Sequence, residues 1–390
     1  MDRIAKWCLK MSYFYGRVTG VLNFEIDLRT GRPEVTRRAT IWAAGLHSVM
    51  FVLLIYHSMT RNVMSNTWKS ANYLHEYVFM VIASFRIVCV LLALLSRWSQ
   101  RRTFIRIFNS FHRLFQHNPD IIKYCHRSIV SKCLCVTMVE TLQLIVILAL
   151  MGNRLTLFLG LRIWAISCLT AIMNVIITQF FIAMAIIRGR YILINKDLQA
   201  IIAETQALVP NGSGLFGSKS CLLADRLERI ARSQSDLQEL IEQLSKAYQG
   251  EVVCMSISYY LNAVGSVYLL FSLHKYGGST DNWPMLITVS SAAYFLFYYL
   301  DCWLNCFNVF YLLDTHNNMV KLVSKWTLFQ PGLDSTLESA FDNFNLNLAR
   351  NPLKLQFYGL FEIDRVSSFA LGNSLLTHSL LLIQYDIEHT

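Results

Sequence analysis

The stretch IWAISCLTAIMNVIITQFFIAMAII, residues 163–187, contains no Asp, Glu, Lys or Arg. A helix needs about 20 mostly apolar residues to cross the roughly 30 Å of hydrocarbon in a bilayer. Residues 163–187 therefore predict a transmembrane helix.

Six further stretches of this kind recur along the chain, at residues 39–59, 73–96, 129–151, 252–273, 285–313 and 366–385. The whole chain of 390 residues is 54% hydrophobic and 15% charged. A soluble domain would carry about 25% charged residues. We therefore predict an all-α membrane protein with seven transmembrane helices.

Lys and Arg residues are distributed unevenly among the segments between these stretches. Alternate segments, beginning with the N-terminal one, contain 28 of them, whereas the remaining segments contain 5. Basic residues accumulate on the cytosolic side of membrane proteins. The pattern predicts a cytosolic N-terminus and an extracellular C-terminus, and the net charge of +10 needs no nucleic-acid partner.

This orientation divides the chain into five parts: a cytosolic N-terminal segment (1–38), spans 1 to 6 with a cytosolic loop at 188–251 (39–313), a cytosolic helical segment (314–365), the last span (366–385) and an extracellular tail (386–390). Two amphipathic helices are expected in the cytosol. Their apolar faces contain Leu223, Leu227, Ile230, Leu237, Leu240, Leu244 and Tyr248 in the first, and Leu337, Phe341, Phe344 and Leu348 in the second. Whether the first face packs within its own subunit or against another subunit remains open.

Two ionisable residues, Arg86 and Glu140, are placed near the middle of spans 2 and 3. An unpaired charge there costs at least about 3 kcal/mol. We expect the two residues either to pair with one another or to contact a ligand.

A candidate ligand pocket is expected in the outer halves of spans 2 to 6, where aromatic side chains occur with a few polar groups. Its residues are Glu76, Phe79, Glu140, Gln143, Trp164, Asn174, Tyr268, Tyr294 and Tyr298. Such a lining suits a small organic ligand, although Tyr and Trp also gather at membrane interfaces without binding anything. The chain carries no H-E-x-x-H, G-x-S-x-G or Walker A signature, so we expect no enzyme, no metal and no cofactor.

The last span is the most polar one. Its polar residues follow one another at helical spacing and form one stripe: Ser367, Ser374, Thr377, His378, Gln384 and Tyr385, with Leu381 among them. Lipid is an unfavourable neighbour for such a stripe, which therefore predicts a pore lining or a polar bundle core.

The segment from Thr377 to Tyr385, THSLLLIQY, resembles the signature of insect gustatory receptors, which is Thr-Tyr, five hydrophobic residues and Gln-Phe. His378 stands in place of the Tyr, and Tyr385 in place of the Phe. Gly359, Leu360 and Phe361 also resemble the family. The seven spans and the cytosolic N-terminus that this family has agree with the independent count above.

The resemblance implies a tastant-gated, non-selective cation channel, in which four identical or related subunits surround the pore within the plasma membrane of gustatory neurons. Gln384 would lie in the outer pore, Leu381 would form a hydrophobic constriction, and Thr377, His378 and Tyr385 would lie beside them. The tastant could be a bitter or a sugar-like compound. Apart from tastant, surrounding lipid and related subunits, no partner is implied.

The short acidic tail adds a separate expectation. Asp386 and Glu388 follow Gln384 within about one turn and are expected to face the outer solution. Repeated around a fourfold axis, these carboxylates would concentrate cations at the pore mouth.

Two other classes of membrane protein compete with a channel. A metabotropic seven-helix receptor would need the N-terminus outside, against the distribution of Lys and Arg. A secondary transporter would more typically show paired halves with spans broken by Gly or Pro, and none is apparent.

Overall fold

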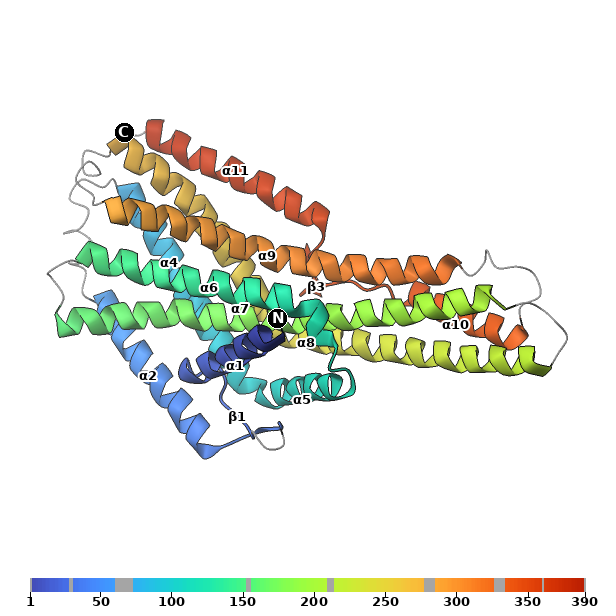
Figure 1. The fold of residues 1–390 in the computed structure, drawn as a ribbon. Helices are drawn as coiled ribbons and strands as arrows, with labels where there is room; N and C mark the ends of the chain where they lie inside the picture. The colour runs from blue at the N-terminus through green and yellow to red at the C-terminus, as the bar shows by residue number, and fades with distance from the viewer. Residues whose placement is uncertain are drawn as a thin grey trace.

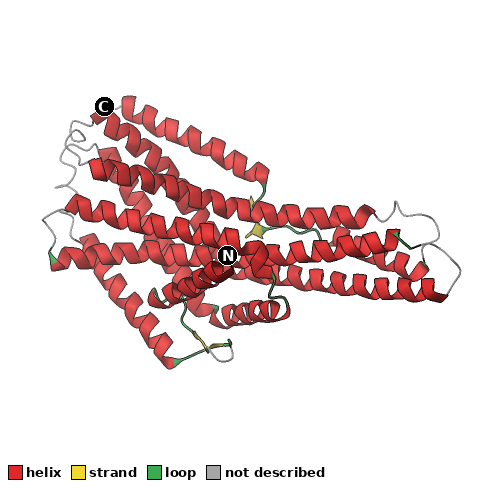
Figure 2. Ribbon diagram, in the orientation of Figure 1, coloured by secondary structure: helices red, strands yellow, loops and turns green. Residues whose placement is uncertain are grey.

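The computed structural model describes residues 2–27, 31–59, 73–151, 156–208, 214–276, 285–325, 334–359 and 361–388. These residues are almost entirely helical, with two short antiparallel hairpins (Figure 2). The helices are α1 (Asp2–Val18), α2 (Arg37–Met59), α4 (Tyr73–Ser99), α5 (Arg101–His117), α6 (Ile121–Met151), α7 (Leu157–Gln206), α8 (Gly214–Tyr276), α9 (Met285–Ser324), α10 (Ser335–Arg350) and α11 (Arg365–Glu388). The strands are β1 (Glu25–Ile26), β2 (Pro33–Glu34), β3 (Gln356–Phe357) and β4 (Phe361–Glu362), paired β1 with β2 and β3 with β4.

Six helical segments within the described part of the chain are long and apolar enough to cross a membrane. They are Arg37–Ile55, Met80–Ser99, Ile121–Ala149, Ile163–Gln206, Met285–Ser324 and Arg365–Glu388. They correspond to six of the seven predicted spans. The remaining one, residues 252–273, is helical within α8 but is not among the six, and the side chains at its C-terminal end lie outside the described residues. The count of seven spans and the orientation of the termini therefore stay predictions.

Three helices, α7, α8 and α9, are far longer than a membrane span. As a result, most of the predicted loop at 188–251 is helical. The helix of span 4 continues without a break to Gln206, and a second helix runs from Gly214 through the predicted loop into 252–273. In Figure 1 the distal halves of α7, α8 and α9 extend together with α10 beyond the other helices. The predicted span ended at Ile187, just before Arg188. In the structure this side chain is buried and donates a hydrogen bond to Ser128 Oγ at 2.7 Å.

The two predicted amphipathic faces are confirmed, and each packs within its own subunit. On α8, Leu227 and Leu244 are 0% and 1% exposed and belong to the main hydrophobic core. The second predicted helix is α10, whose buried residues are Leu337, Phe341, Phe344 and Leu348. Both helices thus extend the core of the transmembrane bundle instead of presenting an apolar surface to another subunit.

A buried ion pair joins the end of α4 to the middle of α8. The Nε and Nη2 atoms of Arg97 at the end of α4 each donate to a carboxylate oxygen of Glu251 on α8, at 2.9 Å. The guanidinium lies 3.9 Å from the ring centroid of Phe104 and 4.4 Å from that of Tyr248. Such fork-like pairing satisfies both charges away from water and fixes the positions of α4, α5 and α8 relative to one another.

The N-terminal helix does not stand apart from the bundle. α1 packs against α6 and α7, with Ala5 0% and Cys8 6% exposed. The hydroxyl of Tyr15 donates a hydrogen bond to the carboxylate of Glu140 on α6. The predicted cytosolic segment 1–38 therefore reaches a residue that the sequence places inside span 3.

The hairpin of β3 and β4 leads the chain from α10 into the last helix. Its turn contains Tyr358 and Gly359 with φ angles of 53° and 66°. Glycine adopts this left-handed conformation without a steric penalty. Phe357 is completely buried against α8, which anchors the hairpin beneath the start of α11.

Candidate functional site

The last helix, α11, is unusually uncovered for an apolar helix. In its most apolar window 6% of the residues are buried, against 83% in the corresponding window of α7. Its packing is mainly with α8, and the residues buried there include Ser379 and Asp386, at 1% and 2% exposure. A helix with this composition cannot leave so much apolar surface in water, so lipid or other subunits must cover it.

The part of the predicted polar stripe that contains Thr377, Leu381 and Gln384 points away from the rest of the subunit. Thr377, Leu381, Gln384 and Glu388 are all exposed, and each lies two residues from Ser379 or Asp386. Two residues correspond to about 200° around a helix, so this row occupies the side opposite α8. The structure thus gives α11 an outward-facing row in which one apolar residue, Leu381, lies between polar ones.

A second exposed row on α11 is purely apolar. Leu376, Leu380 and Ile387 are 61%, 58% and 55% exposed. Leu380 is separated from Leu381 by about 100° around the helix. α11 therefore presents two different surfaces, one suited to lipid or to an apolar protein neighbour and one carrying the polar stripe.

His378 and Tyr385 lie on the flank of the stripe, between it and α8. The hydroxyl of Tyr260 on α8 contacts Nδ1 of His378 and lies 2.9 Å from the Oγ atom of Ser374. Tyr385 is 52% exposed. The hydrogen-bonded partner of His378 is thus on its own subunit, which ties the middle of α11 to α8.

One predicted feature of the acidic tail is wrong. Asp386 does not face the outer solution, because it is 2% exposed and accepts a hydrogen bond from the hydroxyl of Tyr268 at 3.2 Å. Glu388, in contrast, is exposed. Both carboxylates lie on α11, where two residues correspond to about 200° around the helix, so one points toward α8 and the other away from it. The sequence reading had placed them in a tail after the last span instead.

Arg86 and Glu140, which were expected either to pair or to contact a ligand, do not pair with one another. Nη1 of Arg86 donates to Oγ1 of Thr170 at 3.4 Å, and Nε2 of Gln143 donates to the same hydroxyl at 3.3 Å. Glu140 instead accepts hydrogen bonds from Tyr15 and from Nδ2 of Asn174, the latter at 3.0 Å. Arg86 and Glu140 are each hydrogen-bonded to neutral side chains of neighbouring helices, and these contacts replace an ion pair between them.

Several predicted pocket residues do converge inside the bundle. Gln143 and Asn174 belong to the polar contacts just described. Nδ2 of Asn262 on α8 donates to the hydroxyl of Tyr298 at 2.9 Å, and the rings of Tyr298 and Tyr294 stack with centroids 6.0 Å apart. α6, α7, α8 and α9 thus contribute polar and aromatic side chains to a common region of the bundle.

Other predicted pocket residues lie elsewhere. Tyr268 is completely buried against α11, and Trp164 is 39% exposed on the outside of α7. The side chains of Glu76 and Phe79 lie outside the described residues.

A buried ion pair between α6 and α9 was not predicted. Nζ of Lys132 on α6 lies 2.7 Å from both carboxylate oxygens of Asp301 on α9, and the hydroxyl of Tyr259 on α8 donates to one of them at 3.0 Å. The side chains of Lys132 and Asp301 are 0% and 5% exposed. A signal existed in the sequence, because a cation and an anion inside two different predicted spans each require neutralisation.

Comparisons with known proteins agree with the sequence resemblance. The profile of the family described as 7tm Chemosensory receptor matches residues 9–389. Gustatory receptor 59d of Drosophila melanogaster is 64% identical over 389 residues, which cover 100% of both chains. Gustatory receptor 36c of the same species is 35% identical, with 97% of each chain covered.

Among solved structures, the insect olfactory receptor OR5 from Machilis hrabei has a similar fold. It matches with a TM-score of 0.60 and 12% sequence identity, covering 98% of this chain and 99% of that one. The structure of OR5 in complex with eugenol gives a TM-score of 0.59 at 12% identity, with 97% and 98% covered.

Proposed function

Because this chain is a gustatory receptor of the insect chemoreceptor family, we propose that it forms a tastant-gated, non-selective cation channel in the plasma membrane of gustatory neurons. Four identical or related subunits would place their α11 helices around a central pore. The N-terminus would lie in the cytosol and the C-terminus outside, as the distribution of Lys and Arg indicates. The tastant is a small organic compound, of which bitter compounds are one class.

The observation that carries this proposal is the surface of α11. Its polar row cannot face lipid, and its own subunit does not cover it. Assembly of several subunits with these rows facing inward would surround a water-filled path. The apolar row with Leu376 and Leu380 would then lie against lipid or a neighbouring subunit.

Leu381 is the proposed gate. It is 53% exposed and is flanked one turn away on each side by Thr377 and Gln384 in the same row. A narrow ring of leucine side chains excludes water and thereby blocks ions without filling the pore completely. A modest rotation of α11 would replace these side chains by polar neighbours and readmit water.

α8 is the proposed link between tastant and gate. Two of its residues donate hydrogen bonds to α9: Asn262 to the hydroxyl of Tyr298 and Tyr259 to the carboxylate of Asp301. The adjacent Tyr260 contacts His378 on α11. A tastant that favours one position of α8 in the bundle would therefore bias the rotation of α11 by its differential affinity for the two positions.

The deciding experiment is to record from the purified chain in planar bilayers that contain no other protein. A panel of tastants is expected to evoke currents that barely distinguish Na⁺ from K⁺. Binding of a tastant without any current would contradict the channel proposal and favour a metabotropic receptor.

The same preparation tests the role of α8. Tyr260→Phe keeps the ring but removes the hydroxyl that contacts His378, so tastant binding should persist while the maximal current falls. Tyr311→Phe, at a tyrosine on α9 that is 54% exposed, provides the control. Equal currents in the two variants would argue against coupling through Tyr260.

The proposed orientation has its own test. An epitope at the C-terminus should be stained on intact cells, and one at the N-terminus only after permeabilisation. The opposite staining pattern would refute it.

A further inference from the structure

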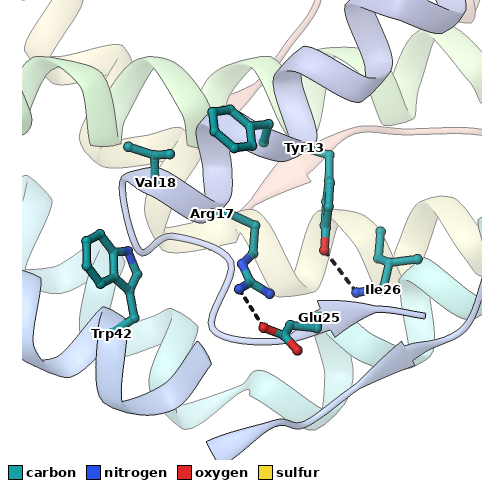
Figure 3. A pocket seen from close by; sticks show the side chains of 7 residues that line it. Tyr13, Arg17, Val18, Glu25, Ile26 and Trp42 are labelled. Atoms are coloured by element: carbon teal, nitrogen blue, oxygen red, sulfur yellow. Dashed lines mark hydrogen bonds and ion pairs between the residues drawn. The ribbon is translucent and has the colours of Figure 1, made fainter. Parts of the chain in front are cut away.

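A cavity of about 440 Å³ lies outside the helix bundle, between α1, β1 and the beginning of α2. Figure 3 shows its lining, which has an apolar side and a polar side. The lining residues are Tyr13, Phe14, Arg17, Val18, Glu25, Ile26 and Trp42. None of them belongs to the polar stripe of α11 or to the predicted tastant pocket.

The apolar side of the cavity continues two exposed apolar surfaces. On α1, Ile4, Trp7, Met11, Phe14 and Val18 follow one another at steps of three and four residues and are between 44% and 62% exposed. On α2, Ile41, Trp42, Val49, Val52 and Ile55 are between 53% and 65% exposed. Since α2 is long and apolar enough to cross the membrane, its exposed side chains face hydrocarbon, and the cavity joins that surface to the row on α1.

The polar side of the cavity offers hydrogen-bond donors from Arg17 and Tyr13. Nη2 of Arg17 donates to Glu25 Oε1 at 2.6 Å, and the Arg17 side chain remains 25% exposed. Nη1 of Arg17 also donates to the Phe24 carbonyl oxygen at 3.5 Å, but a guanidinium has five N–H donors, more than these two contacts use. The Tyr13 hydroxyl accepts the backbone N–H of Ile26 at 3.0 Å, which leaves its own proton available to an acceptor in the cavity.

The depth of the cavity matches a lipid headgroup. Trp42 is three residues after Ala39, where the predicted span begins, which places it about 4.5 Å along the helix. Tryptophan at this depth is typical of the boundary between headgroups and acyl chains. Arg17 and Tyr13 line the same cavity as Trp42 and would then lie near the level of the phosphate groups.

The charge of this region favours an anionic lipid. The first 38 residues contain eight Lys or Arg and four Asp or Glu, a net charge of +4. The cytosolic leaflet, to which the proposed orientation assigns this segment, carries the anionic lipids of a plasma membrane. Glu25 acts against an anion, so a phosphate must share Arg17 with this carboxylate.

We propose that the cavity binds an anionic glycerophospholipid. Its phosphate accepts hydrogen bonds from Arg17 and Tyr13, and one acyl chain lies over Phe14, Val18 and Trp42. The bound lipid fills the gap between α1 and α2 and so completes the membrane-facing surface of the receptor.

The test is a native mass spectrometry titration of the full-length receptor in detergent micelles, with phosphatidylglycerol and phosphatidylcholine of equal chain length as probes. The wild type should retain phosphatidylglycerol in preference to phosphatidylcholine. Arg17→Gln should weaken phosphatidylglycerol binding about tenfold, as loss of a charge-assisted hydrogen bond implies. Arg3→Gln removes an exposed cation at the other end of α1, which does not line the cavity, and should leave the affinity unchanged.

A third variant separates lipid binding from a structural ion pair. Glu25→Gln also breaks the pair with Arg17, but it releases the guanidinium for phosphate and should strengthen phosphatidylglycerol binding. If Glu25→Gln weakened binding as Arg17→Gln does, the pair would be structural and the proposal would fail. Equal loss in Arg17→Gln and Arg3→Gln would also overturn it. So would a wild type that retains no phosphatidylglycerol because another subunit covers the cavity. The measurement uses no tastant and no current, so it stands apart from the channel proposal.

Discussion

Loss of the buried ion pair between Lys132 and Asp301 should destabilise the receptor more than any exposed pair could. Lys132→Met keeps the length of the side chain but leaves the Asp301 carboxylate buried with the Tyr259 hydroxyl and an Asn305 amide 3.4 Å away. Removing one partner of a buried pair costs about 3–5 kcal/mol. At about 1.4 kcal/mol per tenfold change, this corresponds to a decrease of about 100-fold to 4,000-fold in the ratio of folded to unfolded receptor.

The assay is unfolding of the purified receptor in mixed micelles with increasing SDS. Asp301→Asn combined with Lys132→Met removes both charges, and the new amide can still accept the Tyr259 hydrogen bond. The double variant should therefore be more stable than Lys132→Met alone, since no charge remains buried without its partner. A double variant as unstable as the sum of the two single variants would refute this reasoning.

The exposed pair of Arg232 and Glu228 provides a matched control. Nη2 of Arg232 lies 2.8 Å from Oε2 of Glu228 one turn away on α8, but the two side chains are 72% and 62% exposed. Breaking such a pair with Arg232→Met should cost about 0.3–0.5 kcal/mol. The difference between the two results shows how much more a buried ion pair between helices contributes than an exposed pair within one helix.

Three further predictions concern α11 and its ends. Leu381→Ser should raise the current without tastant, because a hydrated constriction no longer blocks ions. Leu380→Ser is the control, since Leu380 has similar exposure but lies about 100° around the helix, and it should not raise this current. Equal leak in both variants would contradict the role of Leu381 as the gate. Glu388→Gln should lower single-channel cation conductance at low salt but not at high salt, where charges are screened within a few Å; equal conductance at low salt would exclude Glu388 from the pore mouth. Asp364 caps α11 by accepting the Ser367 N–H at 2.6 Å, and this hydrogen bonding with Ser367 lowers the pKa of the Asp364 carboxyl. The stability that the Asp364 carboxylate contributes should be fully present above the ordinary pKa of aspartate and be lost as pH falls through the lowered value. The stability difference between wild type and Asp364→Asn in the same SDS assay should therefore shrink at acidic pH. A constant difference would contradict the linkage.

The apolar segments and helical faces could be read directly from the sequence. α10 buries the four residues that its periodicity indicated, and the face of α8 that carries Leu227 and Leu244 is buried as expected. Both signals are local, since a helix fixes which side chains share a face whatever it packs against. The family, too, was recognisable from Thr377 to Tyr385 together with the pattern of spans.

Side-chain partners could not be assigned in the same way. The sequence placed Arg86 and Glu140 at similar depths, but the structure gives each of them neutral partners and pairs Lys132 with Asp301, 169 residues away. Depth along a span limits which residues can meet, but the rotation of each helix about its axis selects among them. That rotation results from the packing of all neighbouring helices together.

The sequence by itself determined that this protein consists of apolar helices, that basic residues gather on alternate connecting segments, and that α11 carries a polar row. These properties follow from composition and helical periodicity, which are local. Only the tertiary structure decided that this row, with Leu381 in it, points away from α8 while Asp386 points toward it. The physical reason is that a helix has a fixed pattern of faces but no preferred neighbour until the surrounding helices, through contacts such as that of Tyr268 with Asp386, select which face they cover.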